Sequence, residues 1–192
     1  MAPISENSTH ASDDPARPLT RIQERLGIFH PLILDFCRHW LEIRHGKPVP
    51  LKRDIDPMAI PTCLPHVWLY RYDPLRDVFI CRLAGEEINL AWGRSIKGRT
   101  LREIVGPDDA AVIHARWRHL LEQPAILHGS RDERLSLHQH KTAERLILPL
   151  TDRENGHATY LIGISIYQIA DEHDTAPVLR DRDILILPCR EI

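Results

Sequence analysis

Apolar and polar positions near the middle of the chain predict a β-hairpin. Residues 67–72 and 78–83 form two short apolar runs rich in β-branched and aromatic side chains, and the turn segment 73–77 separates them. Residues 86–92 then predict a short helical turn that ends at Gly93, because glycine readily adopts the left-handed conformation of a helix C-cap. We therefore expect two paired strands followed by short helices.

An amphipathic helix is expected before this hairpin, in residues 31–44. Its polar residues share one face, and its apolar residues recur at helical spacing, at Ile33, Cys37, Trp40 and Leu41. Gly46 and Pro48 then end the pattern. The apolar stripe could cover the outer face of the protein's own sheet, contact the same helix of a second copy, or do both.

A longer helix is predicted for residues 107–123. Pro107 suits the first helical position, and the carboxylates of Asp108 and Asp109 favour the positive end of the helix dipole. Pro124 ends the helix. The inner stripe consists of Ala110, Ile113, His114, Trp117 and Leu121.

Three further strands are predicted for residues 125–130, 145–151 and 158–167, with a hairpin turn at Asn155-Gly156 between the last two. In the last strand, alternation places Ile162, Ile164 and Ile166 on one face. Leu161, Gly163, Ser165 and Tyr167 lie on the other, which is also largely apolar. A strand that is apolar on both faces is expected to be covered on both sides.

Several short motifs resemble an alphaproteobacterial group of PAS-domain proteins, from about residue 32 to residue 167. They are Leu64-Pro65, Val67-Trp68-Leu69, Cys81-Arg82-Leu83-Ala84-Gly85, Trp92-Gly93-Arg94 and Lys97-Gly98-Arg99. The resemblance implies a sensory or interaction module rather than an enzyme. It does not name a ligand.

Pattern and resemblance together predict an α+β fold, a PAS-like five-stranded antiparallel sheet with helices on its concave face and an N-terminal helix packed outside. The expected divisions are a disordered arm (1–20), an N-terminal helical region (21–50), a PAS-like sensor domain (51–170) and a C-terminal extension (171–192). Apolar residues 184–187 of the extension could add an edge strand or pack on a partner.

Net charge, the length of apolar runs and the spacing of cysteines argue against several classes of function. The 192 residues carry a net charge of −2, which gives no long-range attraction to nucleic acid or anionic lipid. No apolar run approaches the ~18–20 residues that a membrane-spanning helix needs, so a cytoplasmic protein without membrane or nucleic-acid partners is expected. The four cysteines lack metal-ligand spacing and are expected to be reduced core thiols.

The chain holds twelve histidines, which raises the question of a metal or heme. His138 and His140 form a His-x-His pair, but no Asp, Glu or Cys at a suitable spacing completes a metal site, and none is predicted. His114 resembles the heme-binding histidine that some PAS sensors carry on their long helix. A histidine on an apolar stripe is more commonly a hydrogen-bonded core residue or one that orients a ligand, so heme is the less favoured alternative.

A small-molecule pocket is the remaining candidate site. The candidate lining residues are Phe79, Cys81, Leu83, Trp92, Ile113, His114, Trp117, His128 and Ile164. For the bulky apolar side chains alone, a core filled at native density is the favoured interpretation. Two inward imidazoles would then still require partners, which favours a pocket.

No catalytic residue is predicted, because the chain has neither a Gly-x-Ser-x-Gly nucleophile motif nor a phosphate-binding loop. The favoured function is a non-catalytic cytoplasmic sensory or regulatory module that binds a small organic ligand, a signalling protein partner, or both. A homodimer through the N-terminal helix is expected. The alternatives are a heme redox or gas sensor through His114 and a ligand-free interaction scaffold.

Overall fold

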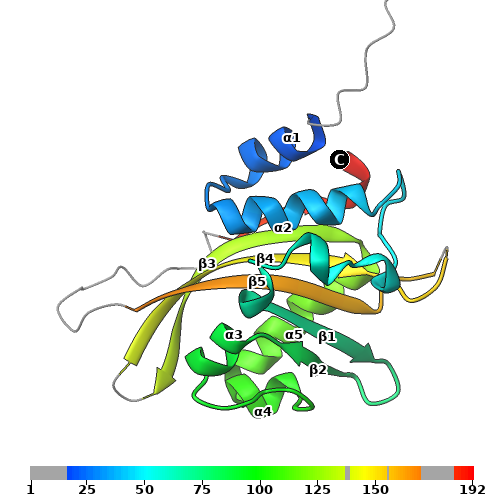
Figure 1. Cartoon of the computed structure of the whole chain (residues 1–192). Helices are drawn as coiled ribbons and strands as arrows, with labels where there is room; N and C mark the ends of the chain where they lie inside the picture. Colours follow the sequence, from blue (N-terminus) through cyan, green and yellow to red (C-terminus); the bar gives the residue numbers. More distant parts are fainter. Residues whose placement is uncertain (1–16, 137–138, 155, 170–183) are drawn as a thin grey trace, which may run out of the picture.

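An antiparallel sheet with helices on both faces forms the body of the protein, as Figure 1 shows. The computed structural model describes residues 17–136, 139–154, 156–169 and 184–192, and the side chains of 130–142 and 168–169 are left out of the description. The strand order is β2-β1-β5-β4-β3-β6. The strands are β1 (Val67–Asp73), β2 (Val78–Ala84), β3 (Ala125–Ser136), β4 (Gln139–Leu150), β5 (Tyr160–Ile169) and β6 (Ile184–Pro188).

The predicted α+β fold, an antiparallel sheet with helices on both faces, is confirmed, with two differences. The sheet has a sixth strand, because Ile184–Pro188 pairs antiparallel with β3 instead of ending in a separate extension. The first described helix, α1, spans Arg17–Leu26, so residues 17–20 are helical and do not belong to an arm. The rest of the predicted arm, His138 and residues 171–183 of the predicted extension lie outside the described residues.

Helix α2 (Pro31–Glu42) and α1 cover the outer face of the sheet (Figure 1). The buried side chains between these two helices and the sheet form the outer cluster, which includes Ile22, Ile33, Phe36, Trp40, Leu148, Ile162, Ile164 and Leu187. Trp40 is 1% exposed, and its Nε1–H donates to the carbonyl oxygen of Pro149 at 3.0 Å. The apolar stripe of α2 therefore covers the protein's own sheet.

Three helices cover the inner face: α3 (Glu86–Ala91), α4 (Leu101–Val105) and α5 (Pro107–Glu122). Helix α4 begins with a capping box, in which the Thr100 hydroxyl accepts from the Glu103 N–H and the Glu103 carboxylate accepts from the Thr100 N–H. Gly106, with a φ of 85°, separates α4 from α5. This left-handed residue lets two helices follow one another on the same face.

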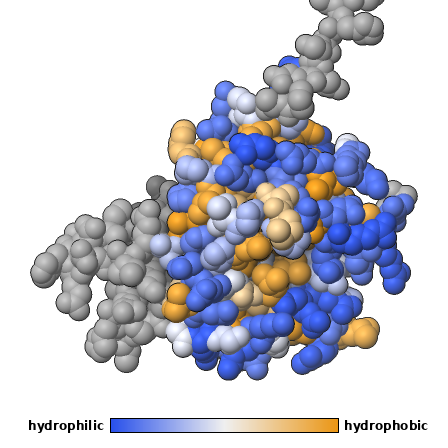
Figure 2. All heavy atoms as spheres, in the orientation of Figure 1, coloured by the Kyte–Doolittle hydropathy of each residue, from blue (hydrophilic) through white to orange (hydrophobic). Residues whose placement is uncertain are grey.

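The inner cluster lies between these helices and the sheet, and includes Trp68, Tyr70, Phe79, Cys81, Ile88, Ile104, Ile113, Trp117, Ile147 and Leu161. Strand β5 contributes to both clusters: Leu161 belongs to the inner one, whereas Ile162 and Ile164 belong to the outer one. The predicted double coverage of this strand is confirmed. On the face that Figure 2 shows, polar and apolar side chains are interspersed over the helices of both layers.

A β-bulge interrupts the alternation in β2. Leu69 lies opposite Leu83, but the next residue of β1, Tyr70, lies opposite Cys81. Arg82 is the extra residue, so Leu83 faces the other way from the side expected by simple alternation. Cys81 is buried in the inner cluster, whereas Leu83 is 45% exposed.

None of the helices in the described parts of the chain combines the length and the apolarity needed to cross a membrane.

Candidate ligand cavity

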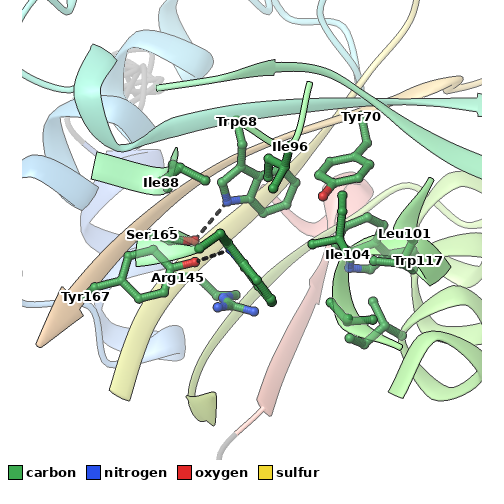
Figure 3. Close-up of a pocket in the computed structure, with 13 residues that line it drawn as sticks. Trp68, Tyr70, Ile88, Ile96, Leu101, Ile104, Trp117, Arg145, Ser165 and Tyr167 are labelled. Atoms are coloured by element: carbon green, nitrogen blue, oxygen red, sulfur yellow. Dashed lines mark hydrogen bonds between the residues drawn. The ribbon is translucent and has the colours of Figure 1, made fainter. Parts of the chain in front are cut away.

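A small cavity, partly open to solvent, lies between the inner helices and strands β1, β4 and β5. Its volume is about 40 Å³, which is room for one or two water molecules, since a water occupies about 30 Å³ in the liquid. Thirteen side chains line it, all drawn in Figure 3, with Ser165, Arg145 and Tyr167 on one side and Leu101, Ile104 and Trp117 on the other. We call this space the inner cavity.

Aromatic side chains form the apolar wall of the inner cavity. The rings of Trp68 and Trp117 are stacked, with centroids 5.4 Å apart and planes 18° apart. Tyr70 packs edge-on against Trp117 at 4.9 Å. Since aromatic pairs at these separations favour such geometries, the wall joins strand β1 firmly to helix α5.

Polar atoms are concentrated on the β5 side. The indole N–H of Trp68 donates to Ser165 Oγ at 2.8 Å, and the indole N–H of Trp92 donates to the Tyr167 hydroxyl at 3.2 Å (Figure 3). Arg145, from the neighbouring strand β4, brings a guanidinium group to the same region. The cavity thus combines aromatic walls with two hydroxyls and one cation.

A second cavity of about 40 Å³ lies next to the inner cavity. Both are lined by Ile113, Trp117 and Arg145, so the two spaces are neighbours at these side chains. The rest of the second cavity is mostly apolar and includes Leu127 and Ile147.

Three of the predicted pocket residues line the inner cavity: Trp92, Ile113 and Trp117. Phe79 and Cys81 are buried in the inner cluster without lining this space. Leu83 and Ile164 face away from it, Leu83 because of the bulge and Ile164 because alternation in β5 places it in the outer cluster beside the inward Ser165. The inward orientation predicted for these two residues is wrong.

His128 also lies away from the inner cavity. Its neighbours Ile126 and Leu127 belong to the outer and inner clusters respectively, so alternation places His128 on the outer face. It is 8% exposed, and its Nε2 lies 3.0 Å from Glu144 Oε1. This carboxylate is the partner that a buried imidazole requires.

His114 lies at the protein surface, beside a groove of about 260 Å³ that Phe79 also lines. Its Nε2 contacts the Asp77 carbonyl oxygen at 3.0 Å and Asp77 Oδ1 at 3.3 Å. An axial heme ligand needs a nitrogen directed into a heme-sized cavity, whereas this imidazole does not line the inner cavity. The residues around His114 therefore do not fit a heme.

Sequence reasoning missed three polar residues of the cavity: Arg145, Ser165 and Tyr167. The sequence did contain a signal for two of them, because alternation along β5 places Ser165 and Tyr167 on the face opposite to that of Ile164. Arg145 gave no such signal, since an arginine in a polar-flanked strand is usually solvated.

The cysteines do not form a reactive or metal-binding site. All four are buried, and burial raises the pKa of Cys37 and of Cys189 to about 12 and that of Cys81 to about 11. Within the described residues, no group of three or more His, Cys, Asp or Glu side chains is placed to hold a metal ion.

Comparison with known proteins identifies the architecture. A family model described as "PAS domain" matches residues 28–166, which is most of the chain. No curated protein sequence matches. A solved fungal LOV domain photoreceptor is similar at 20% identity and a TM-score of 0.40, over 61% of this chain and 94% of that chain.

Proposed function

This chain belongs to the PAS domain family, whose members are generally sensory or signalling modules and typically not catalysts. On that premise we propose that it binds a small organic ligand in the inner cavity and passes the change to a protein partner. The observation that carries this proposal is the composition of the cavity wall. Apolar rings surround a few convergent polar groups, which is the usual constitution of a small-molecule site.

The sheet offers a direct route from the cavity to the outer helices. Ser165 lines the cavity, whereas the adjacent Ile164 packs in the outer cluster against which α2 lies. Trp40 of α2 is hydrogen-bonded to the backbone of β4 at Pro149. Because packed interiors transmit displacement, a ligand that moves β5 would shift the support of α2.

Such a relay requires a difference in affinity. A ligand shifts an equilibrium between two arrangements only by as much as its affinity for them differs. We propose that the ligand favours an arrangement in which β5 and α5 are further apart, because the present cavity is small. The resulting shift of α1 and α2 would then alter a contact that their outer surface makes, either with a second copy of the chain or with a signalling protein.

Recovery of the ligand tests this function. The full chain is purified, its absorption spectrum is recorded, and small molecules released on denaturation are identified by mass spectrometry. We expect a stoichiometric organic molecule from the native sequence. We expect none from Ile104→Phe, which fills the cavity from α4, whereas the matched control Val112→Phe, at a position 54% exposed on α5, should retain it.

Two results would contradict the proposal: release of no molecule from the native sequence, or equal release from both variants. In the second case the molecule binds elsewhere. Folding of each variant is checked by circular dichroism, so that loss of ligand is not confused with loss of structure.

A scaffold without a ligand is the second candidate, and cavity size favours it. Pockets for drug-sized ligands are commonly ~300–1,000 Å³, and the inner cavity has about 40 Å³. A nearly filled core suits a module that acts through its surface. If no small molecule is released and Ile104→Phe leaves partner binding and oligomeric state unchanged, the scaffold is the better description.

A further inference from the structure

Strand β6 lies at an edge of the sheet and offers an interaction surface there. We propose that a second copy of this chain binds along this edge, with its own β6 antiparallel to the first, so that the two sheets join into one. Three observations carry the inference: the direction of the backbone groups of β6, the apolar character of both its faces, and the lack of any charge along it. The inference does not depend on a ligand in the inner cavity.

The pairing of β6 with β3 fixes which of its backbone groups face outward. In the described parts of the chain no strand pairs with the other edge of β6. The register with β3 is unbroken, and just after β6 the Cys189 N–H donates to the Pro124 carbonyl oxygen at 2.9 Å. Hydrogen-bonded residues alternate with the others along an antiparallel pair. Leu187 is therefore hydrogen-bonded to β3, whereas Ile186 directs its N–H and C=O to the open side.

The outward groups of β6 are complementary to themselves. By the same alternation, Ile184 also directs an N–H and a C=O outward, and Pro188 directs only a carbonyl there. With a two-fold axis at Ile186, this residue would exchange two hydrogen bonds with the same residue of the second copy. Each Ile184 N–H would donate to the carbonyl oxygen of Pro188 in the other copy. Every outward N–H of β6 thus finds an acceptor.

The side chains of β6 favour a strand that is apolar on both faces. Leu185 pairs with His128 on the outer face of the sheet, and Ile186 pairs with Leu127 on the inner face. These two side chains of β6 are 43% and 42% exposed, so each face of the edge presents half-covered apolar surface. Strands at a protein surface are commonly apolar on one face only. A second β6 has the composition that would cover both faces.

The edge lacks the features that usually keep edge strands apart. Lysines, inward-pointing charges and bulges commonly prevent such pairing. Strand β6, Ile184–Pro188, has no charged residue, and its pairing with β3 has no bulge. Pro188 stands at its last position, where its missing N–H does not interrupt the row of outward donors. The whole edge is therefore available to another strand.

The edge is also held in place before association. Leu187 is 1% exposed in the outer cluster, and Arg25 of α1 forms an ion pair with Glu191, just after the strand, at 2.9 Å. An ordered edge loses less conformational entropy on binding. Five residues extend over only ~17 Å, and stable interfaces bury ~800 Å² per partner. We therefore expect a weak dimer whose population depends on concentration.

Analytical ultracentrifugation of the full chain between ~10 μM and ~1 mM measures this association. Ile186→Pro removes the outward N–H and leaves the hydrogen bonds to β3 intact, since an edge strand tolerates proline where its N–H faces solvent. Ile186→Val is the matched control, because it keeps the N–H and a β-branched side chain. We expect the native chain and Ile186→Val to dimerise alike. Ile186→Pro should dimerise about ten- to hundredfold more weakly, as for the loss of two hydrogen bonds.

A pair of charged variants tests the two-fold arrangement independently. In Ile186→Lys and in Ile186→Glu, two like charges would lie directly opposite one another across the axis, and such pairs are destabilising. Each variant alone should therefore remain monomeric. An equimolar mixture places a lysine opposite a glutamate, so the mixture should form a dimer that contains one copy of each.

Three results would overturn the inference. A native chain that stays monomeric up to ~1 mM has no such interface. Equal dimerisation of Ile186→Pro and the native chain places the contact elsewhere on the molecule. A mixture of the charged variants that stays monomeric refutes the pairing of the two Ile186 residues. Circular dichroism checks that each variant is folded, and if Ile186→Pro is not, the charged pair decides the question.

Discussion

Gly163 of β5 offers a sharp test of how the cavity wall is built. A Cβ atom at this position would lie 2.2 Å from Cζ2, 2.5 Å from Cε2 and 2.6 Å from Cη2 of Trp68. Carbon atoms in favourable contact are ~3.5–4.0 Å apart, so the indole would have to move by more than 1 Å or so. We therefore expect Gly163→Ala to displace Trp68 from its place against the sheet.

The cost follows from two contributions. Overpacking of a well-packed core costs ~1–3 kcal/mol. Displacement of the indole also breaks its hydrogen bond to Ser165 Oγ, which contributes ~0.5–1.5 kcal/mol. The variant should be destabilised by about 2–4 kcal/mol. A change from glycine to alanine at an unstrained position is stabilising by ~0.4–1 kcal/mol. Gly163→Ala is therefore expected to destabilise the protein only because the new methyl group would collide with Trp68.

Urea denaturation followed by far-UV circular dichroism measures this free energy of unfolding. Ser165→Ala isolates the hydrogen bond and should cost less than Gly163→Ala. In a Trp68→Leu background, Gly163→Ala should cost little, because the atoms that it would meet are absent. A loss below about 0.5 kcal/mol in the native background, or simple additivity in the double mutant, would refute the steric reasoning.

Three further predictions concern the outer helix, a buried thiol and the β1–β2 turn. Trp40→Phe loses the hydrogen bond to the Pro149 carbonyl and should be destabilised by about 1–3 kcal/mol in urea; an unchanged midpoint would show that this bond does not hold α2. Because burial raises the pKa of Cys37 to about 12, its thiol should resist alkylation at pH 8 until the protein unfolds, and rapid labelling located by mass spectrometry would contradict this. The hydroxyl of Tyr72 lowers the pKa of Asp77, so the stabilisation from this carboxylate is present at neutral pH and is lost as the pH falls through the lowered pKa. In Asp77→Asn the free energy of unfolding should therefore fall less steeply as the pH is lowered, and a slope equal to that of the native protein would contradict this prediction.

Much of the fold followed from local pattern. The helix predicted for residues 107–123 is α5, Pro107–Glu122, because Pro107 and the two aspartates mark its start and the apolar stripe fixes its inner face. The hairpin of β1 and β2 was predicted to within a residue or two at either end. Such signals involve residues close together in sequence, so no knowledge of tertiary structure is needed to read them.

The departures arise from long-range pairing. Strand β6 joins the edge of the sheet beside β3, a contact between residues about sixty positions apart that the short apolar run 184–187 left open. The bulge at Arg82 is equally invisible to alternation, because it depends on how β2 pairs with β1. It reverses the face of Leu83 and so removed one predicted residue from the cavity.

The candidate site was predicted less well than the fold for the same reason. Trp92, Ile113 and Trp117 could be assigned because each sits in a helical or near-helical segment with a clear inner face. The two histidines were assigned to the pocket because a buried imidazole needs a polar partner. In the structure His128 has that partner in Glu144, on the outer face of the sheet. Arg145 emerged from the fold alone, since only the pairing of β4 with β5 places it beside Ser165.

The small volume of the inner cavity bears on how a sensor of this kind could work. A roomy pocket could accept a ligand without moving its walls, and then nothing would reach α2. In this chain β5 is tightly packed on both faces. Gly163 lies against the indole of Trp68 on the inner face, and Ile164 is fully buried in the outer cluster on the other. A ligand that enters this space fully and is larger than one or two waters must therefore displace either the Trp117 side of the cavity or the strand itself. Displacement of β5 moves the surface on which α2 rests, whereas displacement of α5 alone does not, so the choice between the two decides whether binding becomes a signal.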